Sequence, residues 1–588
     1  MKIILKKSAL SLCVLIILLT SILSGAWKYF VPALAFLLAI FLPGYTILNL
    51  LCKNFKEQDK VILSFACGTL IVFIFSLLGL ISGQIVLWSI LYFVLSLISL
   101  FFFLKNKWFL KLYQQIDHPV WVYLALIFLL IGTMMVIISI VPEMFFPGLP
   151  SYLNSIKHYR GQIDYYMMYG VAQALIHKLY SGEAVSFLVG GWQLGTRTPY
   201  LAIISIPFLK IFGNDPFIYQ MLCFAIDITY IIPAYFLLIK LFSPKTAKIG
   251  CLFALSAPFM LRWTIYSPQK ILTLYFLFTL LYLFLKDNKK AADYFLIGTI
   301  ATLSLFTHTC SIIGILAIYL FVYLKTRELK KILLSLKYLL LISVIFFLPW
   351  FYWILLHEGL KNNALSIYLY PVAQNSDQLV TDPRNIFSSL THTSPQTIIA
   401  NKFYNFMTFF VPNPLAQLRM LPPGYNLGKI MELISEFCLW GAVGVFLFPF
   451  TIYGAISSWQ KYKKYTIAFL IFPLIFYLCL IGYYHYHGPL AYLYFTALMI
   501  LFLALDFLLS QCKVLSGIIL TLYFLTNTLT FTGKYAASEY IQKAISKHLA
   551  LQIGSGLFLF FLIFLIITFL TFREWKKLTP KANLKINF

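Results

Sequence analysis

Long apolar runs alternate with short polar turns along almost the whole chain. Each run is about 20 residues long, enough for a helix to cross the roughly 30 Å hydrocarbon core of a bilayer. In lipid every backbone N–H and C=O must be paired within its own segment, so these runs are predicted to be α-helices. We predict about sixteen spans, at residues 8–25, 29–50, 61–81, 84–104, 120–141, 217–240, 246–265, 270–286, 291–306, 310–324, 337–355, 432–456, 465–483, 490–510, 513–531 and 552–572.

Composition supports the same class. The 588-residue chain is 61% hydrophobic and only 11% charged, whereas soluble domains are about 45–50% apolar and about 25% charged. The fold class is therefore predicted to be an all-α polytopic integral membrane protein. The net charge of +26 comes from basic residues scattered over short loops. This distribution is typical of membrane topology signals and argues against a nucleic-acid partner.

The apolar run at 199–212 decides the predicted topology. It is short for a span, has an internal proline and carries Lys210 near its end. If it does not cross, the basic clusters at 286–290, 325–331, 460–464 and 573–588 all face the cytoplasm, as the positive-inside rule requires. We therefore expect this run to be a helix lying at, or dipping into, the outer face. Both termini are then cytoplasmic.

The predicted topology divides the chain into four parts. Residues 1–119 form an N-terminal four-helix transmembrane block, and residues 120–355 form a core whose first outer loop is 142–216. Residues 356–431 form a second outer loop, which we expect to fold over the core as a lid. Residues 432–588 form a C-terminal transmembrane block with a short outer turn at 484–488.

The first outer loop is the richest in candidate chemistry. It contains two acids, Glu143 and Asp164, together with His158, Arg160 and Arg197. Apolar residues recur at a spacing of three to four after Asp164, which predicts an amphipathic helix on the membrane surface. These residues are Tyr165, Met168, Tyr169, Ala172, Leu175 and Ile176. Asp164 stands where it could equally cap this helix, and Glu143 could equally be an interfacial charge.

This arrangement resembles the GT-C superfamily of membrane glycosyltransferases. In that family a membrane span leads into a large external loop. The loop contains a surface helix with an acidic residue at its start. A second surface helix, a glycine-containing break and a long span then follow. The matching features span about 120–510. They are Asp164 before two tyrosines, Arg197-Thr198-Pro199-Tyr200, the break Phe212-Gly213-Asn214-Asp215-Pro216, and Thr307-His308-Thr309 at an outer turn. The family's tandem Asp-Glu is absent, and Asp164 lies later after its span than in several members.

The resemblance implies an enzyme that moves a sugar from a polyprenyl-phosphate-type donor to an acceptor at the outer face. Asp164 or Glu143 would be the catalytic carboxylate, with Asp215 as another possible second acid. Arginine suits the donor phosphate because its planar fork binds phosphate oxygens bidentately. The implied phosphate-binding residues are Arg160, Arg197, Arg262, His158 and His308, and the implied sugar- or acceptor-binding residues are Tyr165, Tyr484, His485 and His487.

Several of these residues have ordinary structural explanations. Arg197 and Arg262 could snorkel to the interface, His308 could be a hydrogen-bonded turn residue, and the tyrosines near 484 could belong to an interfacial girdle. The sequence has no metal-binding motif, yet Asp164 and His308 could hold a divalent metal such as Mg²⁺ or Mn²⁺. The resemblance implies a bacterial inner membrane location, with the active site on the outer face.

Three other functions remain open. A flippase or transporter of lipid-linked glycans would use a similar membrane core, although the intramembrane charges are few. A polysaccharide polymerase or ligase would suit the long loop at 356–431. A non-catalytic assembly subunit is the last alternative.

Overall fold

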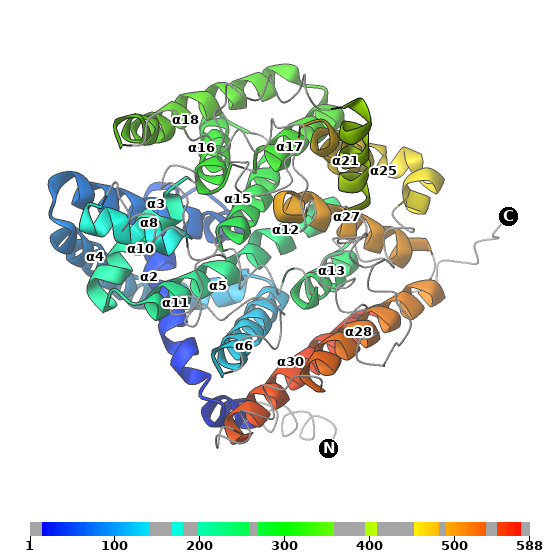
Figure 1. Cartoon of the computed structure of the whole chain (residues 1–588), viewed down its shortest axis with the longest axis horizontal. Coiled ribbons are helices and arrows are strands. Elements are labelled where there is room, and N and C mark those ends of the chain that lie inside the picture. The colour runs from blue at the N-terminus through cyan, green and yellow to red at the C-terminus, as the bar shows by residue number, and fades with distance from the viewer. Residues whose placement is uncertain are drawn as a thin grey trace.

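A computed structural model of the chain describes residues 15–140, 167–179, 198–257, 260, 268–287, 289–309, 311–357, 394–408, 452–480, 490–511, 513–536 and 550–577. Within these ranges the regular structure is entirely helical, which confirms the predicted all-α class. The helices pack into one bundle, with α18 on its periphery (Figure 1).

The described helices fall into two groups along the chain. The first group is α2 (Trp27–Leu51), α3 (Glu57–Ser82), α4 (Ile85–Lys105), α5 (Trp108–Gln115), α6 (His118–Ile140), α8 (Met167–His177), α10 (Tyr200–Phe212), α11 (Pro216–Asp227), the 3-10 turn η2 (Ile228–Tyr230) and α12 (Ile231–Leu241). The second group is α13 (Pro244–Ser256), α15 (Pro268–Phe284), α16 (Ala291–Thr307), α17 (Ser311–Thr326), α18 (Leu329–His357), α21 (Pro395–Thr408), α25 (Trp459–Thr466), the π-helical turn η4 (Ile467–Ile471), α26 (Phe472–Leu480), α27 (Leu490–Gln511), α28 (Lys513–Ala536) and α30 (Ala550–Lys576).

The predicted spans coincide closely with these helices. Seven helices in the described ranges are long and apolar enough to cross a membrane, and six shorter ones are apolar. α11, η2 and α12 together form one of the seven, Pro216–Leu241. The predicted span 432–456 lies mostly outside the described residues. The count of about sixteen spans, the cytoplasmic termini and the four-part division remain predictions.

α2 and α3 cross with their backbones in contact. A Cβ atom on Gly68 would lie 1.8 Å from the backbone oxygen of Ile40, and one on Gly44 would lie 1.9 Å from that of Ser64. The two backbones therefore touch, as small residues permit between membrane helices. Tyr275 of α15 continues this packing, because its hydroxyl donates to the backbone oxygen of Ile62.

The ion pairs found in the described part of the chain all lie at one end of the bundle, which we call the ion-pair end. Near the start of α3, Glu57 is buried and accepts a bond from the Tyr45 hydroxyl and an ion pair of 2.7 Å from Lys111. Asp59, also buried, accepts from the Tyr282 hydroxyl at 2.7 Å and pairs with Lys286 at 3.2 Å. These contacts join α3 to α5 and α15.

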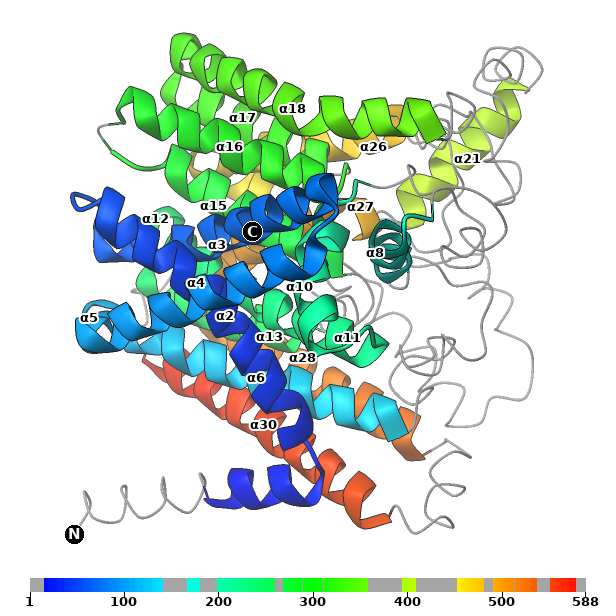
Figure 2. The ribbon, with the colours of Figure 1, turned by 90° about the vertical axis from the view of Figure 1, so that its left-hand side faces the viewer.

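Asp506 makes a second junction at this end. The hydroxyls of Thr246 and Tyr462 each donate to its carboxylate at 2.8 Å, and Lys461 donates at 2.9 Å. Burial lowers the pKa of Lys461, but its bonds to Asp506 and Tyr462 outweigh that effect and raise the pKa above its ordinary value. One carboxylate thus links α13, α25 and α27. Figure 2 shows this end on the left, near α5, and α8 and α21 on the right.

The helix predicted at 199–212 is present as α10, and it lies inside the protein. Tyr200 to Leu209 are all buried. The Tyr200 hydroxyl donates to Thr69, halfway along α3, at 3.0 Å. At the other end of α10, Phe212 packs on Phe36 and Phe93 with ring centroids 5.2 and 5.1 Å apart. α10 therefore dips well into the depth spanned by α2, α3 and α4.

Replacing Gly68 by alanine will destabilise the protein, because the new Cβ must push α2 and α3 apart. We expect a loss of about 1–3 kcal/mol, the usual cost of overpacking, seen as a lower midpoint of thermal unfolding of the detergent-purified protein. Gly554→Ala is the matched control, since a Cβ there meets nothing within 4 Å. Equal midpoints for the two variants would contradict the close crossing.

Candidate functional site

The turn between α10 and α11 clamps α8 at the end opposite the ion pairs. The side-chain amides of Gln173 and Asn214 exchange two hydrogen bonds, and the Asn214 amide nitrogen lies 3.2 Å from Nε2 of His177. The Tyr169 hydroxyl donates to the backbone oxygen of Asn214 at 3.2 Å. The turn can approach α8 in this way because Gly213 has φ of 121°, which suits glycine.

This clamp changes the interpretation of α8. The predicted helix is present, but residues 168–176 are buried on every side, including the polar Gln173. Gln173 can be buried because Asn214 satisfies its amide. Helix α8 begins at Met167, three residues after Asp164. The clamp therefore fixes the position of the helix that follows the predicted catalytic carboxylate, which itself lies outside the described residues.

Asp215 has a structural role in the same turn. Its carboxylate accepts the backbone N–H of Phe217 at 2.7 Å, and Pro216 occupies the first position of α11. This is a standard helix N-cap. The cap accounts for Asp215 without a chemical role as a second acid.

Buried polar side chains gather at the same end of the α15–α16 hairpin. The two helices are each 17 residues long and pack together, so the start of α15 and the end of α16 share one end. Lys270, 4% exposed, lies in the first turn of α15, and His308, 3% exposed, follows α16 directly. Gln269, Thr307 and Ser311 are also buried there. A buried cation and a buried imidazole can together attract an anionic ligand.

The backbone around His308 forms the tight turn predicted from the sequence. Its N–H donates to the backbone oxygen of Ser304 at 3.1 Å, and its own carbonyl accepts from the N–H of Ser311 at 3.0 Å. These bonds end α16 and begin α17. The turn holds the imidazole in the protein interior, at the same end of the α15–α16 hairpin as the start of α15.

Asp227 is buried at a break in the span formed by α11 and α12. It is 0% exposed, and neither carboxylate oxygen has a hydrogen-bond partner in the described structure. The helix tightens into the 3-10 turn η2 directly after it. Asp227 is the twelfth and last residue of α11, which places it about 17 Å along the helix from Pro216. A carboxyl group at this depth is costly and is a candidate functional group.

Most residues implied by the resemblance lie outside the described residues. These are Glu143, His158, Arg160, Asp164, Tyr165, Arg197, Arg262, Tyr484, His485 and His487. Among the described residues no three His, Cys, Asp or Glu side chains form a group that could hold a metal. The predicted Mg²⁺ or Mn²⁺ therefore stays a prediction.

Sequence reasoning missed Lys270. The residue opens an apolar run, where a lysine is ordinarily a boundary charge that reaches water. The available signal was the pair Gln269 and Lys270 directly after Pro268, which places both in the first helical turn. Burial of the lysine depends on packing against neighbouring helices, and this cannot be read from the local pattern.

Comparison with known proteins relates part of the chain to one protein family. No curated protein and no solved structure matches the chain. Residues 196–353 match the dolichyl-phosphate-mannose-protein mannosyltransferase family, a family of the GT-C superfamily. The matched segment runs from α10 to α18 and contains Lys270, His308 and Asp227, whereas Asp164 precedes it. Over residues 196–353 the chain is thus similar to these mannosyltransferases, and the resemblance to the GT-C membrane glycosyltransferases is confirmed.

Proposed function

We propose that the protein transfers a sugar from a polyprenyl-phosphate-type lipid to an acceptor at the outer face of the membrane. The observation that carries this proposal is the family match over 196–353, in the part of the bundle where Lys270 and His308 are buried at one end. Lys286, Lys331 and Lys461, which belong to the short basic segments of the chain, lie at the other end. The positive-inside rule favours that end as cytoplasmic. The candidate site would then face outward.

The proposed reaction needs few groups. An acceptor hydroxyl attacks C1 of the sugar, the bond from C1 to the phosphate oxygen breaks, and the lipid phosphate leaves with the electron pair. A carboxylate takes the acceptor proton, and we assign this role to Asp164 with Glu143 as the second acid. No step is assigned to a metal.

Cationic groups would stabilise the charge that develops on the leaving phosphate. To Arg160, Arg197, Arg262 and His308 we add Lys270, because it is buried at the same end of the α15–α16 hairpin as His308. Aromatic and imidazole groups would contact the sugar or the acceptor. These are Tyr165, Tyr484, His485 and His487.

The clamp on α8 supports the assignment of Asp164. A catalytic carboxylate must be held close to one geometry, since small misplacements reduce rates strongly. The bonds from Asn214 to Gln173 and His177 hold α8 to the turn before α11. Asp164, which we assign as the base, lies three residues before the start of this fixed helix.

Asp164→Asn will abolish most sugar transfer, because the amide cannot accept the acceptor proton. We expect transfer from a radiolabelled polyprenyl-phosphate sugar in membranes to fall about 10²- to 10⁴-fold. Asp287→Asn, on the exposed turn between α15 and α16, is the control and will retain wild-type transfer. Unchanged transfer in Asp164→Asn would exclude Asp164 as the base.

Lys270→Met tests the proposed phosphate site, because it keeps the apolar stem and removes the charge. We expect KM for the lipid donor to rise about 10- to 100-fold, the usual range for losing a hydrogen bond to a charged group. Lys178→Met removes an exposed lysine just after α8 and will leave KM unchanged. Equal KM values in the two variants would remove Lys270 from the donor site.

A lipid-glycan transporter is the second candidate, and Asp227 is the observation that favours it. Unpartnered intramembrane acids at helix breaks commonly mark ion or proton pathways in transporters. If the protein is a transferase, proteoliposomes with Asp227→Asn will still transfer sugar, and the wild-type protein will move no labelled lipid between leaflets. Lipid movement that is lost in Asp227→Asn would favour the transporter instead.

A further inference from the structure

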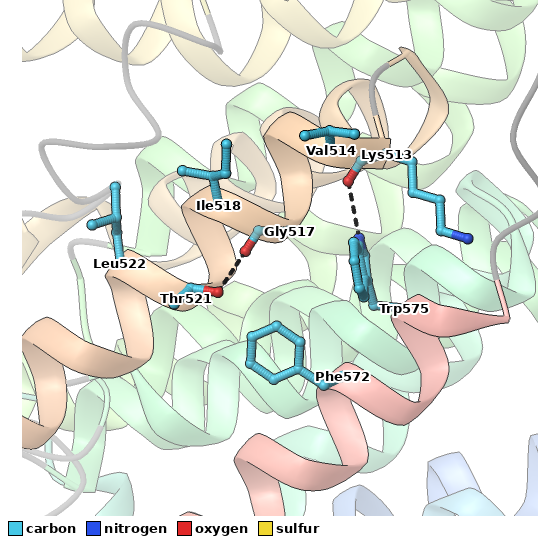
Figure 3. A pocket seen from close by; sticks show the side chains of 8 residues that line it. All are labelled: Lys513, Val514, Gly517, Ile518, Thr521, Leu522, Phe572 and Trp575. Atoms are coloured by element: carbon cyan, nitrogen blue, oxygen red, sulfur yellow. Dashed lines mark hydrogen bonds between the residues drawn. The ribbon is translucent and has the colours of Figure 1, made fainter.

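An apolar groove runs between α28 and α30, starting at the ion-pair end (Figure 3). Its volume is about 570 Å³, within the usual range of about 300–1,000 Å³ for small-molecule sites. One wall is made by Val514, Ile518 and Leu522, which are 72%, 51% and 39% exposed and recur every four residues on one side of α28. Phe572 and Trp575 of α30 also line the groove.

The floor of the groove is formed by the contact between α28 and α30. Trp575 lies directly on Gly517, where a Cβ atom would come within 2.5 Å of its ring. The indole N–H donates to the backbone oxygen of Lys513 at 3.2 Å and to the Ser516 hydroxyl at 3.0 Å. The Thr521 hydroxyl is turned away from a ligand, because it donates to the backbone oxygen of Gly517 at 2.8 Å. The groove therefore offers almost no polar groups along its length.

The mouth of the groove is strongly basic. The Lys513 ammonium lies 3.5 Å from the backbone oxygen of Lys576, and the Lys245 ammonium lies 3.0 Å from that of Lys577. Glu574 is the acid nearest in sequence, and it is already paired with Lys577 at 2.6 Å and Arg573 at 3.2 Å. Cations thus outnumber acids where the two helices end.

We propose that this groove binds an anionic glycerophospholipid of the surrounding bilayer, with its headgroup phosphate at Lys513 and Lys576 and an acyl chain along Val514, Ile518 and Leu522. The basic mouth suits the headgroup phosphate, and the apolar wall suits the acyl chain. The apolar wall lies on membrane helices and the basic mouth lies at the end of those helices. Basic pockets between transmembrane helices are suited to anionic headgroups. The inference does not depend on which reaction the protein catalyses.

Trp575 gives the groove a defined depth in the bilayer. Tryptophan prefers the interface, where its ring is partly apolar and its N–H finds a polar partner. The bonds from its N–H to the first turn of α28 hold the ring at the level of Lys513. A phosphate at that level would occupy the headgroup layer on the ion-pair side, while its acyl chain extends toward the bilayer centre.

Native mass spectrometry of the purified full-length protein in detergent tests the proposal, with dioleoylphosphatidylglycerol and dioleoylphosphatidylcholine as probes. We expect the wild-type protein to bind phosphatidylglycerol more tightly. The double variant Lys513→Gln/Lys576→Gln will weaken that binding about fivefold for each lysine removed. It will weaken phosphatidylcholine binding less, because that lipid carries no net charge. Ile518→Trp, which fills the groove, will weaken binding of both lipids.

Matched controls lie on α18. Lys330→Gln removes an exposed lysine from the same end, and Ile345→Trp enlarges an aliphatic side chain that is 64% exposed. Both will bind phosphatidylglycerol as the wild-type protein does. Equal binding of the two lipids to the wild-type protein would overturn the proposal. So would unchanged phosphatidylglycerol binding in the double-lysine and Ile518→Trp variants. Displacement of phosphatidylglycerol by an equal concentration of a polyprenyl phosphate would also overturn it and assign the groove to the sugar-donor lipid.

Discussion

The high free energy of a charge in hydrocarbon determines how the described side chains are arranged. Glu57, Asp59 and Asp506 are buried, yet each lies near a helix end and each has a cationic neighbour. A buried charge is tolerated when it is paired and its remaining lone pairs accept hydrogen bonds. Tyrosine hydroxyls provide those bonds to all three carboxylates. The ion-pair end is therefore a cross-linked polar layer that ties together helices distant in sequence.

The opposite end has a different organisation. Here neutral amides join α8 to the α10–α11 turn, and Lys270 and His308 are buried near the end of the α15–α16 hairpin. The amide pair holds α8 in place without adding charge. The electrostatic potential at this end is therefore not made more negative by the contact. Such a setting would suit the anionic headgroup of the proposed donor. Lys270 and His308 lie within the segment that matches the mannosyltransferase family, whereas α8 precedes it.

The sequence predicts the helices well because a span needs only length and apolarity. The predicted ranges 29–50, 61–81 and 84–104 differ from α2, α3 and α4 by a few residues. The depth of α10 is not predictable in the same way, since an apolar surface can contact either lipid or protein. The clamp between Gln173 and Asn214 joins residues 41 apart, and local periodicity carries no information about such a pair. Of the predicted site, the helix after Asp164, the turn at His308 and Asp215 lie among the described residues.

The ion-pair end also affects how the chain is made. Asp59 and its partner Tyr282 are separated by 223 residues, so at about 5–20 residues per second α3 is synthesised roughly 10–45 seconds before α15. Throughout that interval the carboxylate has no partner from α15, but its place in the first turn of α3 keeps it near interfacial water. Asp227 lies far from interfacial water, because it is the twelfth and last residue of α11. The two acids therefore differ during co-translational insertion. Asp59 stays near interfacial water until α15 has been synthesised, whereas Asp227 must enter the membrane together with α11.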